Sequence, residues 1–99
     1  MLKLRLSRAA EQHLEDIWLY TISEWGEDQA EKYVALIEKA MSLLPDNPYL
    51  GKVRPDVKPG YRALQAGKHL IFYCVGEEFV DAIGILHTRM VPERQLDER

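Results

Sequence analysis

The chain has 99 residues, which suits one domain spanning 1–99, and 46% of them are apolar, enough for a buried core. A net charge of −3 argues against coating of nucleic acid by bulk electrostatics, and no apolar run approaches the roughly 18 residues of a membrane span. Cys74 is the only cysteine, and the sequence shows neither a metal-ligand spacing nor a secretory signal. We therefore expect a cytoplasmic protein without disulfide, metal or cofactor.

The first half of the chain predicts a strand followed by two helices. Apolar and charged residues alternate over residues 2–6, the pattern of a half-buried strand at a sheet edge. Ser7 suits the N-cap of a first helix that Gly26 ends, and the acidic residues at 27–28 favour the start of a second helix that Pro45 stops. So short a link between helices predicts an antiparallel hairpin.

Apolar side chains recur at helical spacing in both helices and predict that the hairpin covers one face of a sheet. They are Leu14, Ile17, Trp18, Ile22 and Trp25 in the first helix, and Ala30, Tyr33, Val34, Ile37, Met41 and Leu44 in the second. The two tryptophans lie seven residues apart on one helix face. We therefore interpret them as core residues rather than as a platform for stacked bases.

Residues 46–60 predict a long loop, because three prolines and two glycines exclude a continuous helix or a central strand. Loops of this length are uncommon in small domains and are often functional. Positive charge gathers over residues 49–76, where five basic residues accompany only Asp56. The charge pattern leaves two interpretations open, a basic binding patch or an ordinary solvated loop.

Three strands are predicted next, at residues 61–65, 69–75 and 79–87, with turns short enough for an antiparallel meander. The predicted fold is α+β: a two-layer sandwich in which an N-terminal strand joins a mainly antiparallel sheet and an antiparallel helix hairpin packs on one face. Strict alternation makes both faces of the two longer strands apolar. The second face is then covered by the C-terminal tail or a partner, or remains an apolar groove that binds another protein.

The chemically interesting side chains gather near the end of the last predicted strand. By strand alternation His87 and Arg89 share one sheet face, where together they could grip a phosphate or carboxylate. His69 begins the preceding strand and can approach His87 across the ladder, and a ribonuclease could also use Arg62 and Tyr73. The alternative interpretation is a packed histidine and a surface ion pair.

A series of short motifs runs through the chain. In order they are Leu6-Ser7, Ala9-Ala10, Ile17-Trp18, Tyr20-Thr21, Trp25-Gly26, Asn47-Pro48, Leu50-Gly51, Arg54-Pro55-Asp56, Pro59-Gly60, Arg62, Gly67, His69, Ile71-Phe72-Tyr73, Leu86-His87, Arg89-Met90, Arg94 and Leu96. In this order and spacing, over almost its full length, the chain resembles the ParE branch of the RelE/ParE superfamily of type II toxin–antitoxin toxins.

The resemblance implies a RelE/ParE-like fold and a growth-inhibiting toxin of the kind associated with plasmid stabilisation. It implies neutralisation by a cognate ParD-like antitoxin of ribbon-helix-helix type, with no sequence-specific DNA binding by this chain itself. The toxins most similar to it inhibit DNA gyrase, so we expect a protein inhibitor more than an enzyme. Two alternatives stay open: a ribosome-dependent mRNA endoribonuclease of RelE type, and a degenerate toxin that only binds antitoxin.

The resemblance also predicts the functional residues. We expect an effector surface of His87, Arg89 and Arg94, with Arg54 and Arg62 as helpers; for a ribonuclease the catalytic candidates are Arg54, Arg62, His87 and Arg89. The tail after Met90 either forms a short helix begun by Pro92 or is a loose end. The chain departs from its relatives at Gly84, Val91 and Gln95, where basic, acidic and histidine residues are frequent, and it lacks the tyrosine that RelE-type toxins often have near the C-terminus.

Overall fold

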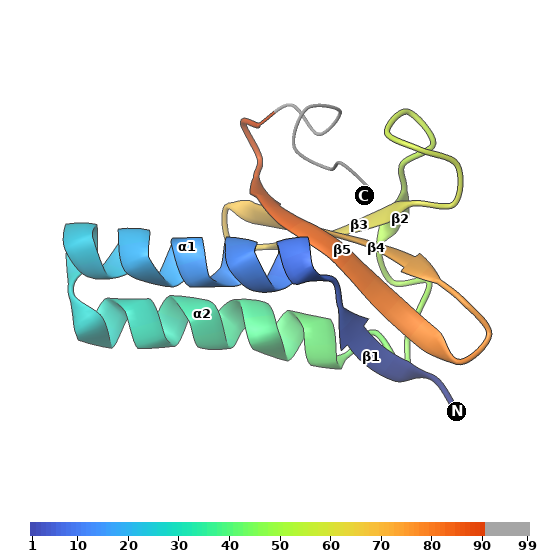
Figure 1. Ribbon diagram of the computed structural model, residues 1–99, viewed down its shortest axis with the longest axis horizontal. Helices are drawn as coiled ribbons and strands as arrows, with labels where there is room; N and C mark the ends of the chain where they lie inside the picture. Colours follow the sequence, from blue (N-terminus) through green and yellow to red (C-terminus); the bar gives the residue numbers. More distant parts are fainter. Residues whose placement is uncertain (91–99) are drawn as a thin grey trace.

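The computed structural model describes residues 1–90, so the tail helix expected after Pro92 and the predicted effector residue Arg94 lie outside the described residues. The elements follow in the order β1 (Lys3–Leu6), α1 (Arg8–Trp25), α2 (Glu27–Ser42), β2 (Lys52–Val53), β3 (Arg62–Ala66), β4 (His69–Val75) and β5 (Phe79–His87). The hairpin of α1 and α2 lies on one face of a five-stranded sheet (Figure 1). The predicted α+β two-layer sandwich is confirmed.

The strands lie in the order β1-β5-β4-β3-β2. The last three form the predicted antiparallel meander, and β1 runs parallel to β5 at the sheet edge that its alternating pattern indicated. At the opposite edge, β2 pairs antiparallel with β3. This two-residue strand lies inside the segment that the sequence predicted to be a loop, and it was not predicted.

Local chemistry sets the boundaries of the two helices. The Ser7 hydroxyl accepts the Ala10 N–H at 3.0 Å and donates to the Ile83 carbonyl at 2.8 Å, so one side chain starts α1 and ties it to the sheet. Gly26 ends α1 with a φ of 93°, a conformation that glycine adopts readily. Helix α2 begins at the next residue and ends shortly before Pro45, as predicted.

A bulge in β5 changes which of its side chains face the helices. The register steps from Gly84 to Ala82 between two successive residues of β4, which leaves Ile83 without a partner in the ladder. An extra residue of this kind reverses the alternation of side chains along a strand. Ala82 therefore joins Ile85 in the core beneath the helices. The strict alternation predicted along this strand, which would place these two residues on opposite faces, is wrong.

The core beneath the helices is built from the predicted stripes. Buried members include Ile17 of α1, Ile37 and Met41 of α2, and Ile71 and Ile85 of the sheet. Trp25 departs from the pattern, since it is 72% exposed. The tip of the hairpin projects past the sheet (Figure 1), so the prediction that Trp25 belongs to the core is wrong.

The second face of the sheet is covered in part by the loop between β2 and β3. Phe72 and Leu86 are buried there, and Val57 of the loop packs against their cluster. The Arg54 guanidinium lies over the Phe72 ring, 5.5 Å from its centroid. The tail or a partner was the expected cover of this face, and that expectation is corrected, because a loop between two strands covers part of it.

Tyr73 holds the segment that leads from α2 into β2 against the sheet. Its hydroxyl accepts the Gly51 N–H and donates to the Pro48 carbonyl, both at 2.8 Å. Gly51 is required by this packing, because a Cβ atom there would lie 2.8 Å from the tyrosine ring. Arg62 adds a hydrogen bond from Nη1 to the Gly51 carbonyl at 2.7 Å.

Candidate functional site: a notch under the hairpin tip

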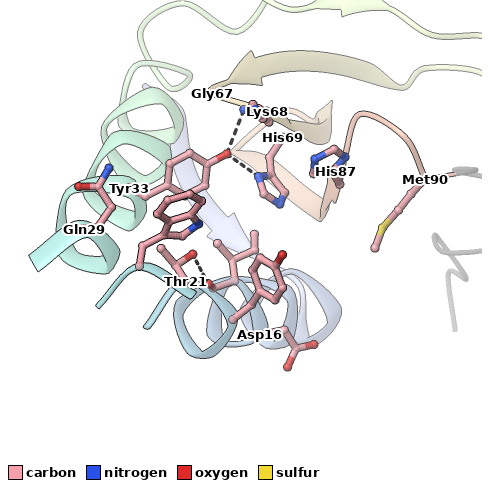
Figure 2. A pocket seen from close by; sticks show the side chains of 12 residues that line it. Asp16, Thr21, Gln29, Tyr33, Gly67, Lys68, His69, His87 and Met90 are labelled. Carbon is pink, nitrogen blue, oxygen red and sulfur yellow. Dashed lines mark hydrogen bonds between the residues drawn. The ribbon is translucent and has the colours of Figure 1, made fainter. Parts of the chain in front are cut away.

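A hollow of about 890 Å³ lies between the projecting tip of the hairpin and the end of the sheet (Figure 2). We call it the notch. Its lining residues are Asp16, Ile17, Tyr20, Thr21 and Trp25 of α1, Gln29 and Tyr33 of α2, Gly67, Lys68 and His69 of the β3–β4 turn and β4, His87 of β5, and Met90. Mostly apolar hollows with a few polar groups are typical of binding sites.

The outer rim of the notch is aromatic. Tyr20 and Trp25 of α1 are 66% and 72% exposed, so two large rings face solvent on the same helix. Deeper in the notch, Ile17 and Thr21 are buried, and the Thr21 hydroxyl donates to the Ile17 carbonyl at 2.6 Å. An apolar hollow rimmed by exposed aromatic rings is characteristic of a surface that another protein covers.

Tyr33 joins α2 to the turn between β3 and β4. Its hydroxyl accepts the Lys68 N–H at 2.9 Å and is hydrogen-bonded to Nδ1 of His69 at 2.6 Å (Figure 2). Gly67 makes this contact possible in two ways. Glycine readily adopts the φ of 61° found there, and its lack of a side chain leaves room for the Tyr33 ring, from which a Cβ atom would lie only 2.7 Å away. The turn and the helix therefore hold His69 in place at the base of the notch.

His69 and His87 are direct partners across the β4–β5 ladder, as predicted, with ring centroids 5.3 Å apart. Burial, and then the neighbouring His87, lower the pKa of His69 to about 4, so this ring is neutral near pH 7. Nδ1 of His87 accepts the Arg89 N–H at 3.1 Å. In its neutral form His87 therefore carries its proton on Nε2, as a hydrogen-bond donor.

Arg89 lies beyond the end of β5, and the chain turns there. The Met90 N–H donates to the His87 carbonyl at 2.9 Å, which closes the turn. Because β5 ends at His87, strand alternation does not extend to Arg89. The prediction that His87 and Arg89 share a sheet face through that alternation is wrong for this reason.

The remaining predicted site residues lie elsewhere. Arg54 makes a bidentate pair with Asp56 in the β2–β3 loop, at 3.0 Å, and this hydrogen bond lowers the pKa of the carboxyl group. Arg62 of β3 lies opposite Tyr73 in the strand ladder, near the far end of β4 and about 13 Å along the strand from the histidine pair. Burial raises the pKa of the Tyr73 hydroxyl, which both accepts and donates a hydrogen bond to the loop backbone. The structure therefore brings His69 and His87 together and leaves both arginines apart from them.

Two general findings concern residues 1–90. Within them, no group of three or more His, Cys, Asp or Glu side chains could hold a metal ion. No helix of this part of the chain is long and apolar enough to cross a membrane.

The approach of the two histidines is predictable from the sequence, but the walls of the notch are not. Helical spacing predicts Tyr33 and Trp25 as core residues; Tyr33 does pack against the core while it lines the notch, and Trp25 does not belong to the core. The position of Trp25 in the sequence could have indicated its exposure. Trp25 directly precedes Gly26, which ends the helix, and so lies at the tip of the hairpin. A tip residue contacts the sheet only if the sheet reaches that far.

Comparison with solved structures concerns the fold. The chain matches one described as "Chromosomal ParDE TA system from P. aeruginosa" with a TM-score of 0.79 and 24% sequence identity, covering 88% of this chain and 96% of that chain. At this identity the match shows a shared fold.

Comparison with known sequences defines the family. The sequence model of the ParE toxin of the type II toxin-antitoxin system parDE matches residues 4–92. Toxin ParE1 of Mycobacterium tuberculosis is 45% identical over 92 residues, covering 92% of this chain and 94% of the relative. Toxin ParE1 of Caulobacter vibrioides is 36% identical over 86 residues, covering 87% of this chain and 88% of the relative.

These matches define a class, the toxins of type II toxin–antitoxin systems. Within that class the chain belongs to the ParE toxin family, and the predicted resemblance is confirmed.

Proposed function

We propose that this ParE-family toxin inhibits DNA gyrase in the cytoplasm and is neutralised by binding a cognate ParD-like antitoxin. The observation that carries the choice of a protein inhibitor over an enzyme is the scatter of the candidate catalytic groups. His87 lies at the notch, Arg54 lies in the loop over the second face, and Arg62 lies at the far end of β4.

A ribonuclease needs its base, its acid and its phosphate-binding cations within hydrogen-bond reach of one phosphate. Of the candidate cations, Arg89 lies next to His87, whereas Arg54 and Arg62 do not. Arg54 is engaged by Asp56, and Arg62 is engaged by the Gly51 carbonyl. Tyr73 uses its hydroxyl to hold the loop. This arrangement supports a chain that acts through its surface.

We assign the effector surface to Arg89 and His87, together with Arg94 of the tail, with Arg54 and Arg62 as helpers. The two helpers also have structural contacts, so their substitution changes both the surface and the loop. Arg89 gives the cleaner test because it follows the last strand and lies in a turn.

Replacing Arg89 with Gln should abolish growth inhibition when the chain is expressed without its antitoxin. The reason is that a cation is removed from the effector surface while the fold keeps its contacts. The matched control is Lys52→Gln, which removes an exposed cation from edge strand β2 and should leave growth inhibition intact. Colony counts after induction and the melting temperature of each variant make the comparison; an R89Q variant that is folded and fully toxic would remove Arg89 from the surface.

The ribonuclease alternative is tested in the same cells. Mapping mRNA 5′ ends after induction should show no cleavage linked to codon position, because gyrase inhibition leaves mRNA intact. Codon-linked ends would instead assign the chain to the RelE activity. Normal growth on expression of the wild-type chain would identify a degenerate toxin.

A further inference from the structure

Arg62 lies at the edge of the sheet where strand β2 pairs with β3. Val53 of β2 is directly opposite Arg62 in this pair, so the two side chains share one face of the sheet. The Arg62 guanidinium lies over the Tyr49 ring, 4.9 Å from its centroid. We call Tyr49, Val53 and Arg62 the edge surface. Strand β2 lies far from the tip of the hairpin, so this surface is separate from the notch (Figure 1).

The contacts of Arg62 hold its side chain in place but use only one of its three nitrogens. Nη1 donates to the Gly51 carbonyl at 2.7 Å and to the Tyr49 carbonyl at 3.4 Å. Within residues 1–90, Nε and Nη2 of Arg62 donate no hydrogen bond and the guanidinium forms no salt bridge. Nε and Nη2 carry parallel N–H groups, a donor pair that matches the two oxygens of a carboxylate.

Two other arginines of the chain show what this pair of nitrogens binds. Arg5 donates from Nε and Nη2 to the carboxylate of Asp81, at 2.6 and 3.3 Å. Arg54 donates from the same two nitrogens to the carboxylate of Asp56, each at 3.0 Å. In Arg62 the equivalent pair has no carboxylate within the described part of the chain. A carboxylate from another molecule is therefore its matching ligand.

The surroundings of Arg62 favour an acidic protein segment over nucleic acid. Residues 52–62 carry four basic side chains and one acidic side chain, Asp56, so an acidic partner is their electrostatic complement. Tyr49 and Val53 are 67% and 61% exposed, which leaves an aromatic ring and an aliphatic side chain in water beside the arginine. The phosphate backbone of DNA would engage the arginine but leave Val53 without an apolar contact. A protein segment supplies both groups.

We propose that the edge surface binds an acidic segment of gyrase, in which an Asp or Glu carboxylate is held by Nε and Nη2 of Arg62 and neighbouring apolar side chains cover Tyr49 and Val53. This inference rests on the proposed inhibition of gyrase and adds a contact surface and its chemistry. Tyrosine and arginine are among the side chains that most often carry the binding energy of protein interfaces.

Val53→Asp tests the surface most sharply, because it places a carboxylate directly opposite Arg62, where it competes for the open nitrogens and repels an acidic partner. The Kd for gyrase holoenzyme on a DNA duplex, measured by biolayer interferometry, should rise about 30-fold or more. Lys52→Gln is the matched control: it lowers the net charge by the same amount on the same strand, but Lys52 lies opposite Ala63, on the other face. Its Kd should change less than about threefold.

Two further positions test the stated chemistry. Tyr49→Ala should raise the Kd for gyrase about tenfold, whereas Tyr49→Phe keeps the ring and should keep the affinity. Arg62→Lys keeps the charge and removes the planar pair of donors, so it should also raise the Kd about tenfold. Arg62 additionally binds the Gly51 carbonyl, so the melting temperature of each free variant checks the fold. Should Arg62→Lys unfold, the exposed positions Tyr49 and Val53 still decide the question.

The outcomes separate this inference from the proposed function. Wild-type gyrase affinity in both Val53→Asp and Tyr49→Ala would overturn the edge surface while gyrase inhibition stands. Fluorescence anisotropy with a labelled DNA duplex and no gyrase tests the other source of anions; variants that lose binding to this duplex but keep their affinity for gyrase would assign Arg62 to DNA phosphate and also overturn the inference. A wild-type chain that does not bind gyrase would overturn the proposed function, and this inference with it.

Discussion

At the scale of single residues, Tyr73 shows how a side chain that looked catalytic acts in structure. Its hydroxyl satisfies the backbone N–H of Gly51 and the carbonyl of Pro48. Tyr73→Phe leaves that N–H without its acceptor in a buried site, so the free energy of unfolding should fall by about 1–3 kcal/mol. Urea unfolding measures it, with Tyr49→Phe, at an exposed tyrosine, as the control. Equal stability of the two variants would contradict this role.

His13 is a second residue with a structural role, because it accepts a hydrogen bond from a backbone N–H of β5 that lies beyond the end of β1. Strand β1 ends before it reaches Ile85, and Nδ1 of His13 on α1 accepts the Ile85 N–H at 3.1 Å. Burial lowers the pKa of His13, as it does more strongly for His69, whose pKa falls to about 4. Both rings are therefore neutral in the folded chain near pH 7.

The pH dependence of stability follows from these two rings. Unfolded histidines titrate near pH 6.5, so below that pH the unfolded chain binds more protons than the folded one. The free energy of unfolding should hold its full value above about pH 7 and fall as the pH drops through 6 toward 5. Urea unfolding at pH 7.5 and 5.5 measures the change, and a His13→Gln, His69→Gln variant should show a smaller one. The same loss in both proteins would assign it to other groups.

At the scale of elements, the β3–β4 turn depends on Gly67 for space as well as for backbone conformation. Gly67→Ala should destabilise the chain more than Gly60→Ala, because both glycines have positive φ but only the first has a neighbour in the way. A Cβ atom at Gly67 would lie 2.7 Å from the Tyr33 ring, whereas nothing lies within 4 Å at Gly60. The left-handed backbone alone costs about 1–2 kcal/mol, and the steric clash adds to it. Thermal unfolding of the two variants makes the comparison, and equal losses would show that Tyr33 does not depend on the glycine.

Elements set by local chemistry were predictable from the sequence. Ser7 starts α1 and Gly26 ends it, because a capping hydroxyl and a glycine act on their immediate neighbours. The bulge at Ile83 and the strand β2 depend on pairing with distant segments, and no neighbouring residue signals them. The face assignment along β5 therefore failed where the helix boundaries succeeded.

At the scale of the whole molecule, those parts of the site that depend on contacts between distant segments could not be predicted from the sequence either. His69 begins one predicted strand and His87 ends the next, so their approach across the ladder could be predicted, whereas their direct pairing also depends on the bulge. The notch could not be predicted, because it depends on how far the hairpin projects past the sheet (Figure 1). That distance is a property of tertiary packing, which also decides whether Trp25 is buried or exposed.

The whole molecule also separates two surfaces by charge. The hairpin is acidic, and the more basic part of the chain from residue 49 onward carries the residues that we propose for the effector surface. His87 lines the notch at the end of β5, between these two layers.

A supercoiling assay with purified proteins shows whether the chain inhibits gyrase and whether its antitoxin neutralises it. The chain added to gyrase, ATP and relaxed plasmid should stop supercoiling and accumulate cleaved DNA, and an equimolar amount of ParD should restore supercoiled product. Undiminished supercoiling with no cleaved DNA, at a large excess of folded chain over gyrase, would contradict the account.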